Sequence, residues 1–310
     1  MSTETIGWIG TGRMGSALAG RLLDAGLDVS VYNRTRAKAE KLVGKGARVV
    51  DTPAELADRD VVFVMVSTSQ DLAEVLTGPD GILTVASSAP RIIVDSSTVS
   101  EAASAQMRAA ARERGVELLA APVSGNPAVI EAGKLTVAVS GPRDSYDEVA
   151  HLIAHFGRGV TYVGSGEVAR LVKIAHNVFL GVVIQSLAEI TVLAERGGVP
   201  RAAFLEFLND SVMGSVFSRY KTPALVNLDL TPTFTNILLA KDIELGLEAG
   251  RRLGVPMPLA SATGQLVHSA VGAGHTAEDF ASLILEQARR SGYVIESESV
   301  PVDDGLGDQG

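Results

Sequence analysis

The chain has 310 residues, 46% of them hydrophobic and 20% charged, with a formal net charge of −9 at pH 7. This composition is typical of a globular protein with about two domains of roughly 150 residues each, and the acidic balance argues against a nucleic-acid partner. The lack of cysteine excludes disulfides, and the sequence has no signal-peptide pattern and no apolar run of about 18 residues, so we expect a cytoplasmic protein without a membrane segment.

The first recognisable pattern is a strand, a glycine-rich turn and a helix. The strand is predicted at 5–9, the turn GTGRMG spans 10–15, and an apolar-faced helix follows at 16–23, before a second strand at 28–32. A G-x-G-x-x-G turn in this setting is typical of a dinucleotide-binding unit. Its glycines permit a tight turn, a close approach of the pyrophosphate and close packing of helix on strand, with the phosphates at the helix N-terminus. The cofactor contacts predicted here are Gly10, Thr11, Gly12, Arg13, Met14 and Gly15.

The residues after the second strand predict which nicotinamide cofactor is bound. An NAD-binding unit carries an acidic residue there, which binds the ribose 2′-hydroxyl. This chain has Asn33, Arg34 and Thr35 instead, with no carboxylate. A guanidinium suits the 2′-phosphate of NADP, and the threonine hydroxyl can add a hydrogen bond. The sequence therefore predicts NADP(H), with NADPH preferred over NADH; the alternative is an arginine that is only solvated in a loop.

Strands and helices continue to alternate as far as about residue 164. Further strands are predicted at 48–50, 61–66, 91–95, 117–121, 135–140 and 160–163, with helices at 100–114 and 145–156. This alternation predicts an α/β Rossmann domain with a doubly wound, mainly parallel sheet. Ligands bind at the carboxyl ends of such strands. We therefore expect Val66, Ser67 and Thr98, which follow two neighbouring strands, to lie beside the cofactor.

A polar turn, APVSGNP, follows the sixth strand from Ala121 to Pro127 and falls at the same edge of the sheet. Ser124 and the backbone amide of Gly125 are suited to bind a small anion, for which a carboxylate is the natural guest. The alternative is a turn of proline, glycine and asparagine that binds nothing.

A single long helix is predicted from Glu167 to Arg196, with Ser165 as a candidate N-cap and glycine and proline after its end. The helix is apolar on most sides, so we expect much of it to be buried. Lys173 and Asn177 lie four residues apart on one face of it. A lysine in such an apolar helix indicates a candidate functional residue. The alternative is a lysine whose side chain only extends along the helix to solvent.

The rest of the chain is predicted to be helical. Helices are expected at 201–208, 235–252, 257–272 and 277–290. Four segments follow from this pattern: an NADP-binding Rossmann domain at 1–164, an interdomain helix at 165–196, an all-helical substrate and oligomerisation domain at 197–292, and an acidic tail at 293–310. The tail has five carboxylates from residue 296 onward and no basic residue, so it is predicted to be disordered.

Four motifs, GWIGTGRMGSALAGRLLDAG, APVSGNP, GEVARLVKIAHN and LLAKDIELG, occur in this order. With them the chain resembles the β-hydroxyacid dehydrogenase family, which includes 3-hydroxyisobutyrate dehydrogenase, from about residue 5 to 292. The resemblance implies an NADP(H)-dependent oxidoreductase that interconverts a small β-hydroxy acid and its semialdehyde or keto form. It also implies a homodimer or homotetramer, and a small hydroxy acid or carbonyl compound as the partner.

The resemblance implies a role for each matching residue. Lys173 resembles the catalytic lysine, and Asn177 the residue that hydrogen-bonds substrate. Ser124 and Gly125 resemble the site of the substrate carboxylate. Further roles are implied for Thr98, near the nicotinamide, for Lys241, which closes over the cofactor, and for Phe234 and the loop 211–217, which shape the substrate pocket.

The chain departs from the family pattern in the polar turn. Ala120 stands where an acidic residue is usual, and Asn126 replaces a glycine, so Asn126 is predicted to bring a side chain to the pocket entrance and to affect substrate choice. The chemistry is retained, because hydride transfer to a carbonyl leaves an alkoxide and an ammonium at Lys173 can supply its proton.

Two other activities remain open. An imine reductase on the same scaffold typically has aspartate or tyrosine at the lysine position, so Lys173 argues against it. A non-enzymatic regulator that binds NADPH would keep Arg34 but would have no reason to keep Lys173 with Asn177. A sugar-phosphate substrate of the 6-phosphogluconate type is disfavoured by the lack of a basic cluster in the helical domain. The five histidines show no metal-ligand spacing, and no metal is expected.

Overall fold

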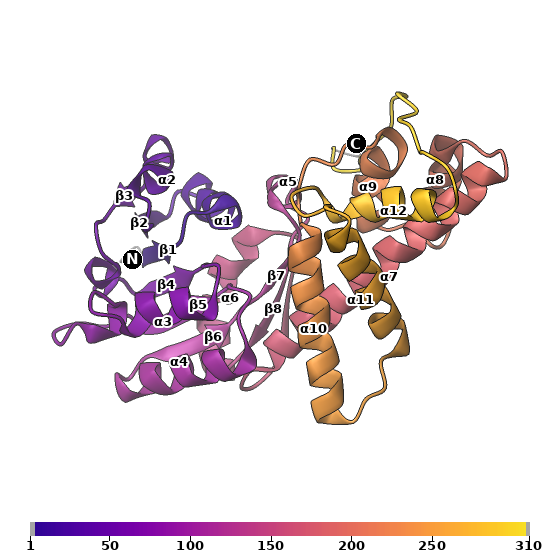
Figure 1. Ribbon diagram of the computed structural model, residues 1–310. Helices are drawn as coiled ribbons and strands as arrows, with labels where there is room; N and C mark the ends of the chain where they lie inside the picture. The colour runs from indigo at the N-terminus through magenta and orange to yellow at the C-terminus, as the bar shows by residue number, and fades with distance from the viewer. Residues whose placement is uncertain (1–3, 308–310) are drawn as a thin grey trace. The chain divides into compact units, whose positions relative to one another are not determined.

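Each half of the chain has its own hydrophobic core in a computed structural model, which describes residues 4–307 (Figure 1). Unit 1 is Met1–Lys173 and unit 2 is Ile174–Gly310. The boundary falls inside the long helix, whereas this helix was expected to form a segment of its own.

The described residues of unit 1 form a nine-stranded sheet with the order β3-β2-β1-β4-β5-β6-β8-β7, and β9 pairs with β8. Strands β1 to β6 are parallel to one another, β8 is antiparallel to β6 and β7, and β9 is parallel to β8. The predicted doubly wound, mainly parallel sheet is therefore confirmed. The strands are β1 (Thr5–Ile9), β2 (Asp28–Tyr32), β3 (Arg48–Val49), β4 (Val61–Val64), β5 (Ile92–Asp95), β6 (Glu117–Ala120), β7 (Val123–Ser124), β8 (Thr136–Ser140) and β9 (Gly159–Gly164).

The helices of unit 1 include three that the sequence did not predict. Helices α2, α3 and α5 are short, and each begins directly after a polar residue at its N-cap position, Thr35, Thr68 and Asn126 respectively. Helix α3 begins after Thr68, whose Oγ1 accepts a hydrogen bond from the Asp71 amide, as an N-cap does. The helices are α1 (Arg13–Asp24), α2 (Arg36–Glu40), α3 (Ser69–Thr77), α4 (Glu101–Glu113), α5 (Pro127–Glu131) and α6 (Arg143–Ile153).

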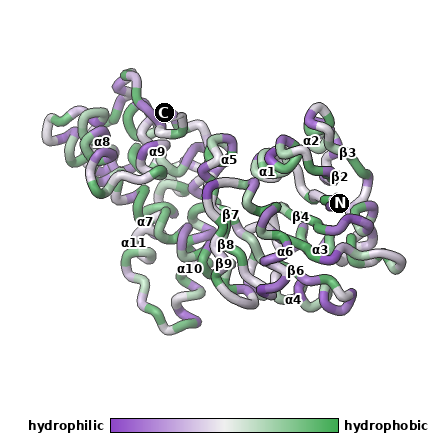
Figure 2. Tube along the Cα trace, turned by 180° about the vertical axis from the view of Figure 1, so that it is seen from behind, coloured by the Kyte–Doolittle hydropathy of each residue, from purple (hydrophilic) through white to green (hydrophobic). Residues whose placement is uncertain are grey.

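The core of unit 1 lies directly behind the glycine-rich turn. All four residues of β4, VVFV, are buried, as expected for a parallel strand covered on both faces, and Figure 2 shows it as hydrophobic. The Trp8 ring stacks on Phe63 with centroids 5.5 Å apart, and Phe156 meets both rings edge-on. The Trp8 Nε1 donates to the Gly10 carbonyl at 2.9 Å, so this aromatic cluster holds the turn from behind.

The long helix α7 runs from Val168 to Arg196, within one residue of its predicted start. Glu167 lies just before it and pairs with Arg108 at 2.6 Å instead of opening the first turn. By length and composition alone α7 would also suit a membrane span, and half of its most apolar stretch is buried in the protein. Ile184, Leu187 and Ala188 belong to the core of unit 2, so the helix is accounted for as a core helix.

Unit 2 is helical, as predicted, but contains one helix that the sequence did not indicate. Helix α9 has Pro223 in its interior, where a proline disfavours a helix because it removes a backbone donor. The helix forms nevertheless, with Ser215 capping its N-terminus and Leu225 buried in the core. The helices after α7 are α8 (Arg201–Asp210), α9 (Val216–Asn227), α10 (Asn236–Leu253), α11 (Pro258–Gly272) and α12 (Leu283–Arg290).

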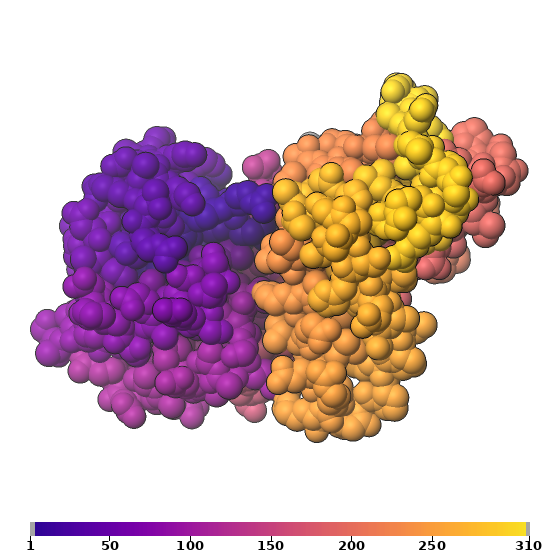
Figure 3. All heavy atoms as spheres, in the orientation of Figure 1, coloured from indigo at the N-terminus to yellow at the C-terminus, as the bar shows by residue number. Residues whose placement is uncertain are grey.

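The tail differs from its prediction over residues 293–307. It forms no helix or strand there, yet Ile295 is buried in the core of unit 2, and the yellow residues of Figure 3 lie on the surface of this unit. Glu298 accepts hydrogen bonds from the backbone amides of Arg201 and Ala202, at 2.6 and 3.0 Å. A carboxylate at a helix N-terminus is favourable, so Glu298 holds this part of the tail against α8. Residues 308–310 lie outside the described residues.

Candidate functional site

The glycine-rich turn has the geometry that its pattern predicts. Gly10 has φ +96°, and a Cβ there would lie 2.1 Å from the Met65 carbonyl oxygen. A Cβ on Gly15 would lie 1.9 Å from the Gly10 carbonyl oxygen. Neither position accepts a side chain, because the turn and helix α1 pack directly against each other and against the end of β4.

The space beside Gly12 fits the phosphates of a dinucleotide. A Cβ on Gly12 would meet nothing within 4 Å. Within the described part of the chain, no side chain caps the N-terminus of α1, so its amides are available to an anion. The Thr11 Oγ1 is buried and has no hydrogen-bond partner among these residues. An open backbone, uncapped amides and an unsatisfied hydroxyl together suit a bound pyrophosphate.

Asn33 ties this turn to the end of β2. Its Oδ1 accepts a hydrogen bond from the Thr11 amide at 2.9 Å, and its Nδ2 donates to the Thr35 carbonyl at 3.0 Å. The side chain thus joins the phosphate-binding turn to the segment that carries Arg34. Thr35 stands at the N-cap position of α2, and its backbone carbonyl, rather than its hydroxyl, accepts the hydrogen bond from Asn33.

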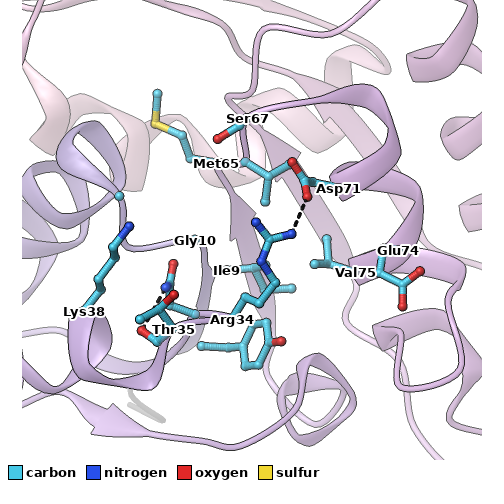
Figure 4. A pocket seen from close by; sticks show the side chains of 14 residues that line it. Ile9, Gly10, Arg34, Thr35, Lys38, Met65, Ser67, Asp71, Glu74 and Val75 are labelled. Carbon is cyan, nitrogen blue, oxygen red and sulfur yellow. Dashed lines mark hydrogen bonds and ion pairs between the residues drawn. The ribbon is translucent and has the colours of Figure 1, made fainter.

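A pocket opens beside this segment at the carboxyl edge of the sheet (Figure 4). Burial, together with the carboxylates of Asp80 and Glu74, raises the pKa of Tyr32 despite nearby Arg34, so its phenol is neutral at pH 7. The pocket also takes in side chains from α2 and α3 that the sequence did not single out, because these helices were not predicted. Its lining residues are Ile9, Gly10, Gly12, Tyr32, Asn33, Arg34, Thr35, Lys38, Met65, Val66, Ser67, Asp71, Glu74 and Val75.

The remaining predicted contacts lie next to this pocket. Arg13 is exposed and opens α1, whereas Met14 packs partly against the core of unit 1. The Val66 amide donates to Ser97 Oγ at 2.9 Å, which joins the ends of β4 and β5 just before the half-buried Thr98. These loops therefore form one connected edge.

A buried arginine that the sequence did not indicate holds this edge to α7. Arg170 donates to Asp95 Oδ2 at 2.5 Å and also to the Ser97 carbonyl, and Asp95 Oδ1 accepts from the Ser97 amide at 3.0 Å. Arg170 lies three residues before Lys173, so the bonds fix the turn of α7 that carries the lysine. In the sequence, this role is indicated only by the presence of an arginine in an apolar helix, three residues before Lys173.

The polar turn after β6 differs in part from its prediction. Gly125 has φ +144°, and a Cβ there would lie 2.7 Å from Leu135, so the turn requires glycine. Ser124 pairs with Thr136 in the short strand β7, and Gly125 is exposed. Asn126 is buried, and its Oδ1 accepts from the Val129 amide at 3.0 Å. Asn126 thus caps helix α5, a role that the sequence analysis did not assign to it.

In unit 2, Asn177 and Lys241 are linked through a third residue. The Asn177 Nδ2 donates to Asp242 Oδ2 at 2.6 Å, and Lys241 Nζ lies 3.3 Å from Asp242 Oδ1. The Asn177 Oδ1 also contacts His176 Nδ1 at 3.0 Å. Asp242 is almost fully buried and so fixes the orientation of the Asn177 amide. The sequence noted Lys241-Asp242 as a motif but gave the aspartate no role.

Phe234 is positioned by a buried ion pair. Its ring meets Phe280 edge-on with centroids 5.7 Å apart. The segment before it is held by Asp279, which accepts from the Thr233 amide at 2.9 Å and from Lys221 Nζ at 2.6 Å. Burial alone would raise the pKa of Asp279, but the Lys221 ammonium and the hydrogen bonds outweigh it and hold the pKa below its usual value.

Comparison with known proteins identifies the family. Residues 5–164 match the model for the NAD-binding domain of 6-phosphogluconate dehydrogenase, and residues 164–286 match the NAD-binding model of NADP-dependent 3-hydroxyisobutyrate dehydrogenase. The chain belongs to the β-hydroxyacid dehydrogenase family. It is therefore an oxidoreductase with an NAD(P)-binding Rossmann fold.

Similar members of this family align with nearly the whole chain. Glyoxylate/succinic semialdehyde reductase 2 of Arabidopsis thaliana is 30% identical, over 92% of this chain and 79% of its own length. The 2-(hydroxymethyl)glutarate dehydrogenase of Eubacterium barkeri is 30% identical, over 90% and 93%. The crystal structure of 3-hydroxyisobutyrate dehydrogenase from Salmonella typhimurium superposes with a TM-score of 0.81 at 27% identity, over 91% and 99%.

The imine reductases are more distant from this chain. The structure of the Myxococcus stipitatus imine reductase in complex with NADP⁺ has a TM-score of 0.59 and 22% identity, over 90% of this chain and 98% of its own. At this identity the likeness shows a shared fold alone.

Proposed function

We propose that the protein is an NADP(H)-dependent reductase that interconverts a small β-hydroxy acid and its semialdehyde, with Lys173 as the group that gives and takes the proton. The observation that carries this proposal is the pair Lys173 and Asn177, four residues apart in one helix of a chain of this family. NADPH, when bound, supplies a hydride to the carbonyl carbon. The ammonium of Lys173 gives its proton to the carbonyl oxygen and stabilises the charge that develops there. In the reverse direction the neutral amine accepts the hydroxyl proton.

The other residues of the site bind and orient substrate in this proposal. Ser124 and the Gly125 amide bind the substrate carboxylate, Asn177 hydrogen-bonds the substrate under the control of Asp242, and Phe234 shapes the pocket. Asn126 acts through its cap on α5, which sets the position of Gly125. Two relatives are named for acids, glyoxylate or succinic semialdehyde in one and 2-(hydroxymethyl)glutarate in the other, which supports an acid substrate.

The proposed preference for NADP(H) rests on Arg34, with Thr98 near the nicotinamide and Lys241 closing over the cofactor. The carboxyl end of β2 and the three residues after it hold no carboxylate, and two cations of the pocket, Arg34 and Lys38, are suited to a 2′-phosphate. We further propose that the protein forms a homodimer or homotetramer. Exposed apolar side chains on α7, among them Phe179 and Leu193, support such an association.

The proposal is tested by NADPH consumption with methylmalonate semialdehyde, succinic semialdehyde, glyoxylate and a cyclic imine. We expect turnover of at least one acid aldehyde, and a loss of about a thousandfold or more in Lys173→Ala because a proton donor and a charge-stabilising group are removed together. Lys41→Ala removes an exposed lysine from the same unit and serves as the matched control. Turnover of the imine alone would assign the protein to the imine reductases, and tight NADPH binding without turnover would indicate a regulator.

A further inference from the structure

The arginine expected to bind the 2′-phosphate already has a protein partner. Arg34 Nη1 lies 2.8 Å from Asp71 Oδ1. Arg34 comes from the segment after β2 and Asp71 from the first turn of α3, and both line the same pocket. In Figure 4 the two side chains point toward each other across it. A phosphate that binds Arg34 therefore has to compete with a carboxylate.

The aspartate is the fixed member of this pair. Thr68 Oγ1 donates to Asp71 Oδ2 at 2.8 Å, and the Asp71 amide donates to the same hydroxyl at 3.0 Å. The side chain of Asp71 is 24% exposed, whereas that of Arg34 is 85% exposed. The guanidinium can therefore move, but the carboxylate stays at the pocket when the guanidinium leaves.

The charges of the pocket are balanced rather than basic. Arg34 and Lys38 contribute two positive charges, and Asp71 and Glu74 contribute two negative ones. Tyr32 adds none, since a phenol is neutral at pH 7. A 2′-phosphate adds further negative charge, whereas the 2′-hydroxyl of NAD adds none. The two carboxylates therefore act against NADP(H) selectively, and Asp71 does so by direct contact with the phosphate-binding group.

We infer that Asp71 is a specificity-determining residue, which competes with the cofactor 2′-phosphate for Arg34 and so limits the preference for NADP(H) over NAD(H). The inference rests on the proposed role of Arg34. A carboxylate–guanidinium pair at the surface is weak, and a phosphate can bind the same fork through two charge-assisted hydrogen bonds. The phosphate thus displaces Asp71, but at a reduced net affinity.

The variant Asp71→Asn tests this inference. The affinities for NADPH and NADH are measured directly, with the fluorescence of the reduced nicotinamide as the signal. Asparagine keeps the size of the side chain and an oxygen for Thr68 but removes the charge. We expect NADPH to bind about tenfold more tightly, a change of about 1.4 kcal/mol, and NADH to change by less than about twofold. Glu74→Gln is the matched control, because it removes the same charge from the same pocket without a bond to Arg34. We expect it to strengthen NADPH binding only about twofold.

The double variant Arg34→Ala/Asp71→Asn tests separately whether Arg34 binds the 2′-phosphate and whether Asp71 competes with the phosphate for Arg34. If Arg34→Ala alone weakens NADPH binding and Asp71→Asn strengthens it, the gain from Asp71→Asn disappears in the double variant, as expected for coupled residues. Unchanged or weaker NADPH binding in Asp71→Asn, with Arg34→Ala still harmful, would overturn the inference and leave the proposed cofactor intact. If Arg34→Ala leaves NADPH binding unchanged, both the inference and the assignment of Arg34 to the 2′-phosphate are wrong.

Discussion

Two of the arginine–aspartate pairs of unit 1, Arg34–Asp71 and Arg170–Asp95, lie at the carboxyl edge of its sheet and differ in nearly every physical respect. In the Arg34–Asp71 pair the arginine side chain is 85% exposed, and its guanidinium donates to Asp71 Oδ1 at 2.8 Å. The side chains of the Arg170–Asp95 pair are 2% and 0% exposed, and the guanidinium also bonds Ser97 and Ser104. A ligand can replace Asp71 as the partner of the exposed Arg34, whereas the Arg170–Asp95 pair is enclosed by protein.

The difference assigns the two pairs to different tasks. A surface ion pair contributes little to stability, so replacing its carboxylate by a phosphate loses little. A buried pair is held because leaving either charge alone in the interior is costly. In the proposed function, Arg34 therefore selects the cofactor, whereas Arg170 positions the turn of α7 that carries Lys173. Each of the following changes acts on one side of this comparison.

The largest effect is expected from Arg170→Met, which leaves the Asp95 carboxylate buried without its partner. We expect the free energy of unfolding of unit 1 to fall by about 3–5 kcal/mol. Urea unfolding followed by tryptophan fluorescence reports on this unit, because Trp8 is the single tryptophan of the chain and lies fully buried in the core of unit 1. Arg34→Met is the matched control and should leave the unfolding midpoint unchanged. Equal losses in the two variants would contradict the comparison.

A smaller loss is expected when the buried pair of unit 2 is broken. Lys221→Met leaves Asp279 with only its hydrogen bonds and should destabilise the protein by about 3 kcal/mol at pH 7. The pKa of Asp279 is lower in the folded chain than in the unfolded one, so its contribution is complete above about pH 4 and is lost as the pH falls through the folded pKa. In urea unfolding followed by circular dichroism, wild type and variant should converge on acidification. A difference that is constant from pH 7 to pH 3 would show that Asp279 is not the group responsible.

The smallest effect is expected from Asn33→Ala, which sharpens the assignment of Arg34. The substitution removes the bond to the Thr11 amide and loosens the phosphate-binding turn. At about 1 kcal/mol for one hydrogen bond, NADPH and NADH should both bind roughly fivefold more weakly, since both carry the pyrophosphate. Arg34→Ala should weaken NADPH alone. A cofactor-selective loss in Asn33→Ala would instead place its side chain at the 2′ position.

The sequence was informative where local chemistry decides the structure. The turn from Gly10 to Gly15 has no alternative to glycine at its two ends, and apolar runs such as VVFV are typical of strands that are covered on both faces. Arg34 could be singled out as a candidate because it follows a strand with a known direction. These features depend on neighbours in the chain, so their pattern is visible without a structure.

The features that the sequence did not indicate depend on partners far along the chain. Arg170 and Asp95 are 75 residues apart, and Asn177 and Asp242 are 65 apart. Helix α9 forms around Pro223 because its buried residues pack into the core of unit 2, against the local preference of proline. Asn126 was expected to bring its side chain to a pocket entrance, and in the structure its Oδ1 caps helix α5. Asparagine is a favoured N-cap residue, and Pro127 is the first residue of the helix.

The most direct measurement of the central claim is a single turnover of enzyme preloaded with NADPH, in which wild type and Lys173→Ala are mixed with the acid aldehyde that the wild type reduces. The account predicts that both bind NADPH with similar affinity and that the rate of NADPH oxidation falls about a thousandfold or more in the variant. Oxidation at the wild-type rate in Lys173→Ala would contradict the role of Lys173 as the proton donor.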